Sequence, residues 1–213
     1  MPVDAKICGI NTPESMKAAL DNGAAHVGLV FFPPSPRAVS IMQAASLAAP
    51  VPNHINTVGL FVDPDDDLIA RTLEAVPLDI LQLHGNESIA RCAEIKARTG
   101  RQIMKVIGIK DEKDLEQVSQ YIDVCDMMLF DAKAPRGAKL PGGNATAFDW
   151  QILAGRSWSK PWMLAGGLNV DNVASAVKIT GAQCVDASSG IEDAPGQKSP
   201  TKIADFLTKI KSL

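Results

Sequence analysis

The feature that most constrains the fold is an alternation that repeats along the whole chain. Short runs rich in Val, Ile, Leu and Phe alternate with amphipathic stretches, and each gap between two runs holds one stretch long enough for a helix. This alternation is typical of βαβ units, in which helices cover the faces of a parallel sheet. Eight runs are predicted to be strands: 5–10, 26–31, 56–62, 79–85, 102–109, 127–132, 162–168 and 183–190.

The amphipathic stretches carry the signals expected at helix ends. Eight helices are predicted: 13–22, 42–49, 64–76, 87–98, 112–122, 149–155, 169–180 and 200–211. Three of them start with a polar N-cap followed by proline, the caps being Thr12, Asp63 and Ser199. Glycine follows the end of three helices, at Gly23, Gly100 and Gly181.

Eight strand and helix pairs in 213 residues predict a single-domain α/β fold, a (β/α)8 TIM barrel that spans residues 1–213. A doubly wound sheet is the alternative. The barrel is favoured because small and polar residues follow the strands, and in a barrel the carboxyl ends of all strands meet at one mouth. These residues are Cys8, Gly9, His84, Gly85, Asp131, Gly166, Gly167 and those at 186–190.

Composition narrows the class of partner and the compartment. The formal net charge of −3 gives no basic surface for nucleic acid, no apolar run is long enough to span a membrane, and the first 20 residues lack a secretory signal pattern. We therefore expect a cytoplasmic protein with a small-molecule partner, and neither nucleic acid nor membrane. The four cysteines are scattered without metal-ligand spacing, so we expect free thiols and no metal site: Cys8, Cys92, Cys125 and Cys184.

Two loops after predicted strands stand out. "FFPPSPRAVS" contains three prolines and Arg37, and "AKAPRGAKLPGGNATAF" is the longest loop, with Lys133, Arg136 and Lys139. A loop of that length in a compact domain is usually functional. We interpret it as a lid over the mouth, the alternative being an exposed insertion without a role.

The loops after the last two strands predict an anion site. "AGGLNVDNV" and "VDASSGIE" place glycines and serines where barrels often bind phosphate through backbone N–H groups. Glycines also serve ordinary tight turns, so the prediction depends on two such loops following adjacent strands.

Two side chains could carry acid–base chemistry. A free cysteine on a strand is more often a small buried apolar residue, but Lys6 lies two residues before Cys8, on the same face, and can favour the thiolate. Asp131 follows the apolar run "MMLF", so desolvation is expected to raise its pKa. The alternative for Asp131 is an aspartate that caps a loop.

Seven motifs give the chain a resemblance to a known family. They are "KICGI", "SPRAV", "LQLHGNE", "LFDA", "GGNATAFDW", "LAGGLNVDNV" and "VDASSGIE". In this order the chain resembles the phosphoribosylanthranilate isomerases of tryptophan biosynthesis, in their single-function form. One departure is that Asn144 and Ala145 stand where the family often has Ser or Thr followed by Gly.

The resemblance implies a cofactor-free Amadori rearrangement of N-(5-phospho-β-D-ribosyl)anthranilate to 1-(2-carboxyphenylamino)-1-deoxy-D-ribulose 5-phosphate. It implies Cys8 as the base and Asp131 as the acid, with Arg37 binding the anthranilate carboxylate and Asp186 near the sugar hydroxyls. His84 is expected to orient the substrate or to be structural. The implied phosphate-binding residues are Gly166, Gly167, Ser188, Ser189 and Gly190.

Two other functions remain open from the sequence. A histidine-pathway aminoaldose isomerase would share the phosphate loops, but its first strand is expected to end in Asp rather than in Cys8. A phosphate-binding barrel without catalysis is expected to lack the pair formed by Cys8 and Asp131. The sequence is compatible with a monomer or a homodimer.

Overall fold

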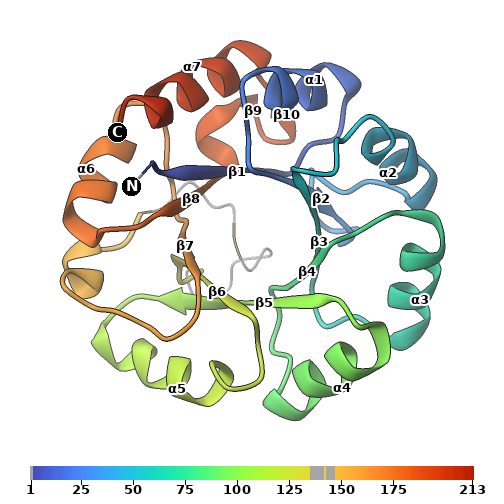
Figure 1. Ribbon diagram of the computed structural model, residues 1–213, viewed down its shortest axis with the longest axis horizontal. Coiled ribbons are helices and arrows are strands. Elements are labelled where there is room, and N and C mark those ends of the chain that lie inside the picture. The colour runs from blue at the N-terminus through green and yellow to red at the C-terminus, as the bar shows by residue number, and fades with distance from the viewer. Residues whose placement is uncertain (1, 135–141, 143–146) are drawn as a thin grey trace.

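The computed structural model describes residues 2–134, 142 and 147–213. Eight parallel strands pair in chain order and close into a barrel, which confirms the predicted (β/α)8 fold and excludes the doubly wound sheet (Figure 1). The strands are β1 (Asp4–Cys8), β2 (His26–Val30), β3 (Asn56–Phe61), β4 (Ile80–Leu83), β5 (Gln102–Ile109), β6 (Met127–Ala132), β7 (Trp162–Leu164) and β8 (Cys184–Ala187). Closure joins β1 to β8, with Lys6 opposite Asp186 in the register.

The helices surround the ring of strands (Figure 1). They are α1 (Pro13–Asp21), α2 (Ile41–Ala48), α3 (Asp66–Ala75), α4 (Ile89–Thr99), α5 (Val118–Tyr121), α6 (Val173–Thr180) and α7 (Pro200–Lys211). The described residues also include three short 3-10 helices: η1 (Glu112–Gln117), η2 (Trp150–Leu153) and η3 (Ser189–Ile191).

The predicted helix caps are correct in part. Thr12 caps α1 in a reciprocal capping box with Ser15, and Gly100 follows α4 in the left-handed conformation. The prediction for Asp63 is wrong, because α3 is capped by Asp65, whose side chain accepts the N–H of Leu68. Ser199 is the N-cap of α7, but its side chain makes no capping hydrogen bond.

Three regions differ most from the predicted elements. The predicted helix at 112–122 is divided into η1 and α5, and the one at 149–155 is reduced to η2. The sequence pattern also missed an antiparallel pair, β9 (Glu192–Ala194) with β10 (Gln197–Lys198), between β8 and α7. This pair brings two charged residues to the barrel mouth, as described below.

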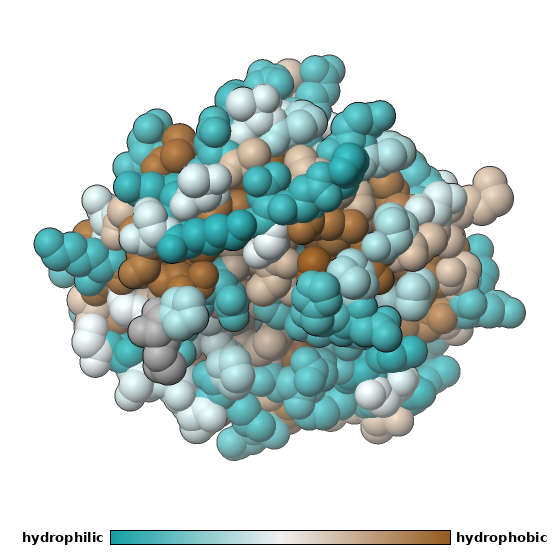
Figure 2. All heavy atoms as spheres, turned by 45° about the horizontal axis from the view of Figure 1, so that its top comes forward, coloured by the Kyte–Doolittle hydropathy of each residue, from teal (hydrophilic) through white to brown (hydrophobic). Residues whose placement is uncertain are grey.

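The barrel is filled by side chains rather than open. Alternate residues of each strand point inward or toward the helices, so one apolar cluster lies inside the barrel and a larger one between strands and helices. The inner cluster comprises Val58, Ile80, Met104, Val106, Leu129, Met163 and Ala165. Hydrophilic residues predominate on the face drawn in Figure 2, with apolar residues in small areas between them. Within the described part of the chain, no helix is long and apolar enough to cross a membrane.

Candidate active site

The carboxyl ends of the strands surround one cavity, as expected for a barrel of this kind. The empty space there, open solvent included, is about 490 Å³. Five residues are predicted to be catalytic or to contact a part of the substrate other than its phosphate. All five line this cavity: Cys8, Arg37, His84, Asp131 and Asp186. The fold therefore brings together side chains from β1, β6, β8, the loop after β2 and the turn after β4.

Cys8 is the last residue of β1, and Lys6 lies on the same inward face, as the two-residue alternation predicts. The buried ammonium of Lys6 is 2.9 Å from Oδ1 of Asp186, and its charge also acts on the thiol of Cys8. Burial raises the pKa of the Cys8 thiol, and the charge of Lys6 opposes that rise without cancelling it. The influence of Lys6 thus has the expected sign, but Cys8 is a thiol at neutral pH in the free protein.

Gly28 on β2 makes room for both side chains, which sequence reasoning did not anticipate. A Cβ at this position would lie 3.2 Å from Sγ of Cys8 and 3.2 Å from Nζ of Lys6. Any larger residue would have to displace one of them, so the absence of a side chain on β2 is part of the site.

Asp131 on β6 is 8% exposed at the rim of the same cavity. Burial, together with the nearby charge of Asp186, raises the pKa of its carboxyl to about 7. The N–H of Ala132, which donates to Oδ1 at 2.7 Å, and the ammonium of Lys6 oppose this rise only in part. A substantial fraction of Asp131 is therefore protonated at neutral pH, in agreement with the desolvation expected from the sequence.

His84, on the turn after β4, places Nε2 3.6 Å from Oδ2 of Asp131. Its Nδ1 is 3.5 Å from Nε2 of Gln82, which lies two residues earlier on the same inward face. Burial, then the ammonium groups of Lys105 and Lys6, lower the pKa of His84 to about 3. The imidazole is therefore neutral at physiological pH and faces Asp131 as an uncharged neighbour.

Arg37 is buried rather than solvated, at 6% exposure. Its Nε and Nη2 donate to the two carboxylate oxygens of Glu192 on β9, at 2.7 and 2.8 Å. Glu192 also accepts from Nζ of Lys198 on β10 at 2.6 Å, and these two cations outweigh the effect of burial and lower the pKa of Glu192. Glu192 is the last residue of the motif "VDASSGIE", but no local sequence pattern indicates its pairing with Arg37 or with Lys198.

The two loops predicted to bind phosphate lie side by side at the ends of β7 and β8. Gly166 and Gly167 have φ values of 91° and 65°, which favour glycine. A Cβ on Gly190 would lie 2.0 Å from the carbonyl oxygen of Leu168, so the second loop packs directly on the first. Ser188 accepts from Nζ of Lys198 through its carbonyl and hydroxyl oxygens, at 3.0 and 3.2 Å.

Ser189 begins η3 next to this contact. The pair of loops thus combines glycine backbone, two serines and a buried ammonium, a combination that can bind an anion.

The long loop after β6 is described at its two ends and at one position between them. Lys133 forms an ion pair with Asp114, and Gly142 lies against the site, since a Cβ there would be 2.6 Å from Cε1 of His84. The predicted lid residues Arg136 and Lys139 lie outside the described residues, as do Asn144 and Ala145.

Comparison with known proteins identifies the family. The sequence profile of N-(5'-phosphoribosyl)anthranilate (PRA) isomerase matches residues 5–209. The chain belongs to the PRA isomerase family. It is 53% identical to the N-(5'-phosphoribosyl)anthranilate isomerase of Rhodospirillum centenum over 208 residues. This matched region covers 97% of each chain. The protein of the same name from Cereibacter sphaeroides is 53% identical over 205 residues, covering 96% of this chain and 97% of that protein.

Solved PRA isomerase structures share the fold over almost the whole chain. The isomerase from Thermotoga maritima superposes with a TM-score of 0.88 at 34% identity, covering 99% of this chain and 100% of the other. A PRA isomerase in complex with reduced 1-(o-carboxyphenylamino)-1-deoxyribulose 5-phosphate superposes with a TM-score of 0.85 at 33% identity, with the same coverage. The resemblance stated from the sequence motifs is thus confirmed.

Proposed function

We propose that this chain catalyses the PRA isomerase reaction, the Amadori rearrangement of N-(5'-phosphoribosyl)anthranilate, with Cys8 as the base and Asp131 as the acid. The observation that carries the proposal is that a thiol and a protonated carboxyl line one cavity in a barrel of this family. An aldose-to-ketose rearrangement needs one group that donates a proton and another that removes one.

The reaction starts with ring opening. Asp131 donates its proton to the ring oxygen of the ribose as the bond between that oxygen and C1 breaks, and the anthranilate nitrogen supplies the electrons that form the C1=N bond. The raised pKa suits this step, because a carboxyl with an ordinary pKa would have no proton to donate at neutral pH. Ring opening leaves a protonated Schiff base and an Asp131 carboxylate.

The second step moves a proton from C2. Cys8, as thiolate, removes that proton, and the electron pair of the C–H bond forms C1=C2 while the C1=N electrons return to nitrogen. The C2 hydroxyl of the resulting enolamine then gives its proton to the Asp131 carboxylate, and C1 takes one from the Cys8 thiol, which yields the aminoketose and returns both groups to their starting forms. Lys6 supports the thiolate form in this step, against the effect of burial.

We assign substrate contacts by charge and position. The buried guanidinium of Arg37 suits the anthranilate carboxylate, Asp186 suits the sugar hydroxyls, and the loops containing Gly167 and Ser188 suit the phosphate. His84 orients Asp131 or the substrate. The single barrel serves as the catalytic domain, the cytoplasm is the proposed location, and the partner is the phosphorylated substrate.

The direct test is an assay with the proposed substrate. Purified protein is mixed with N-(5'-phosphoribosyl)anthranilate, and its fluorescence should disappear as the product forms, while Cys8→Ser and Asp131→Asn should leave the fluorescence almost unchanged. Wild-type protein that consumes the histidine-pathway aminoaldose but not this substrate would support the other isomerase. Wild-type protein that binds phosphate but consumes neither compound would overturn catalysis.

A further inference from the structure

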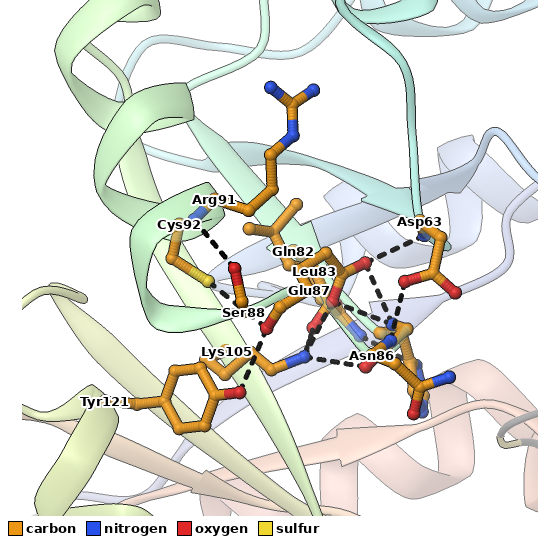
Figure 3. Close-up of polar contacts among 12 residues, drawn as sticks. Asp63, Gln82, Leu83, Asn86, Glu87, Ser88, Arg91, Cys92, Lys105 and Tyr121 are labelled. Atoms are coloured by element: carbon orange, nitrogen blue, oxygen red, sulfur yellow. Dashed lines mark hydrogen bonds and ion pairs between the residues drawn. The ribbon is translucent and has the colours of Figure 1, made fainter.

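A buried polar cluster next to the site has no part in the reaction described so far (Figure 3). At its centre Nζ of Lys105, on β5, lies 2.6 Å from Oε2 of Glu87, which follows β4, and both side chains are at most 4% exposed. A buried ion pair is weak evidence for stability, because the cost of removing both charges from water often offsets their attraction. Apolar side chains of the same volume often stabilise a protein equally well. The geometry that the pair imposes is therefore the more informative feature.

The pair holds the turn that carries His84. The carboxylate of Glu87 accepts the backbone N–H of Gly85 with both oxygens, at 3.0 Å each, and Lys105 donates to the carbonyl oxygen of Gly85 at 2.8 Å. The N–H of Gly85 belongs to the peptide that links it to His84. Both peptides of Gly85 are thus fixed, and the direction in which His84 leaves β4 is fixed with them.

The turn after β3 is held by the same carboxylate. Asp63 donates its N–H to Oε1 of Glu87 at 2.9 Å, and its own Oδ1 accepts the N–H of Asn86 at 2.7 Å (Figure 3). Among the described residues Asp63 is the one non-glycine with a positive φ, 46°. Such a conformation costs on the order of 1–3 kcal/mol and persists where its surroundings enforce it. Gly85 packs closely against Asp63, because a Cβ at position 85 would lie 2.5 Å from Oδ1 of Asp63.

The cluster also sets the electrostatic surroundings of His84. The charged groups around the imidazole are Lys105 from β5, Lys6 from β1, Asp131 from β6 and Glu87 from its own loop. Burial is the largest influence on the pKa of His84 and Lys105 the next, and both favour the neutral ring. A cationic imidazole 3.6 Å from Asp131 would favour the carboxylate form and take away the proton that the first step needs.

We propose that Glu87 and Lys105 are positioning residues for the acid of the reaction: they hold His84, uncharged, beside Asp131, so that Asp131 keeps the proton it donates. The role of Asp131 rests on the proposed function. The placement and charge of His84 do not, and they can be measured in the free protein.

The test removes both charges together, because substitution of only one of the two residues would leave the other as an unpaired buried charge. In the free Glu87→Gln/Lys105→Met protein, NMR of the imidazole should show His84 titrating at least one pH unit higher than in wild type. At pH 7.5 an imidazole with a pKa one unit above about 3 is still neutral, so the expected fall in kcat of about tenfold or more comes from the loss of the fixed position of His84 beside Asp131, while KM changes less than about threefold. If this variant does not fold, Glu87→Gln/Lys105→Gln, which also leaves no unpaired charge and keeps a donor for the carbonyl of Gly85, is measured in the same way.

A control comes from a second pair of a lysine and a carboxylate, which is less buried than the first. Lys96 on α4 lies 2.7 Å from Asp126, which precedes β6 at the opposite end of the barrel. Lys96→Met/Asp126→Asn should lower stability but leave the His84 titration and kcat at wild-type values. If it changes them as much as the Glu87 and Lys105 variant does, the effect is one of general stability and the proposal is wrong.

Repeating the double substitution in a protein that also carries His84→Asn distinguishes an effect that acts through His84 from a general structural effect. Without an imidazole, the Glu87 and Lys105 changes should cause no further loss of kcat and no further shift of its pH profile. An equal loss in both backgrounds, or an unchanged His84 titration in the double variant, would overturn the proposal. If wild-type protein has no PRA isomerase activity, the proposed function fails, and the titration alone still decides whether the pair keeps His84 neutral.

Discussion

Replacing Asp131 by Asn should stabilise the protein at alkaline pH while it removes activity. The carboxyl is buried, and burial together with the charge of Asp186 raises its pKa from an ordinary 3.8 to about 7. In the unfolded chain its pKa returns to about 3.9. The folded protein therefore carries the cost of a buried carboxylate at any pH above 7, and asparagine, of nearly the same shape, does not ionise.

The size and sign of the effect follow from linkage. A rise in pKa from 3.8 to about 7 corresponds to about 4 kcal/mol at 1.36 kcal/mol per pH unit. Between pH 4 and 7 the folded state retains a proton that the unfolded state has lost, so the stability of wild type falls as pH rises through this window. Asp131→Asn should be about 2–4 kcal/mol more stable than wild type at pH 8, and nearly equal to it at pH 4.

Urea unfolding at several pH values between 4 and 8 measures this difference. The slope of free energy against urea should be the same for both proteins, so that the midpoints report stability. Exposed Asp171 provides the control, and Asp171→Asn should differ from wild type by less than about 0.5 kcal/mol at every pH. A difference for Asp131→Asn that does not grow between pH 4 and 8 would refute the assignment of Asp131 as a buried, protonated acid.

Three further variants test the rest of the site. Cys8→Ser should lower kcat about 10²-fold or more with little change in KM, and should lose the rise of kcat with pH that thiolate formation causes; wild-type kcat in this variant would make Cys8 a packing residue. Sulfate should raise the melting temperature of wild type but not that of Gly167→Leu, and equal protection of both would contradict the phosphate site. Arg37→Lys should lower kcat/KM by about one to two powers of ten, because an ammonium cannot make the two parallel bonds of a guanidinium, and a loss below about twofold would remove Arg37 from substrate binding.

The strands could be predicted because each one is buried between the barrel interior and the helices, so its sequence is apolar almost without interruption. Their ends could not be predicted as well. The apolar run of β7 continues to Leu168, but the strand ends at Leu164 because Gly166 and Gly167 adopt positive φ values. An apolar run cannot show where its backbone leaves the extended conformation.

Helix starts were also misjudged where side chains compete with the helix for backbone groups. The predicted helix from residue 169 begins only at Val173, because Oδ1 of Asn169 accepts the N–H groups of Asp171 and Asn172. Similarly, Asp63 and Asp65 both flank Pro64, and the choice of Asp65 as the cap depends on contacts of Asp63 with the next loop. Those contacts join separate loops and leave no local pattern.

The largest gap between sequence and structure concerns ion pairs. Arg37 and Glu192 lie 155 residues apart in the chain and meet because the loop after β2 and the β9–β10 pair cover adjacent parts of the mouth. This pairing fixes the orientation of the guanidinium, and an oriented guanidinium loses less entropy when it binds a carboxylate. The same Glu192 binds Lys198, which donates to Ser188 in the second phosphate loop. One buried carboxylate therefore links the proposed position of the anthranilate carboxylate to the proposed position of the phosphate.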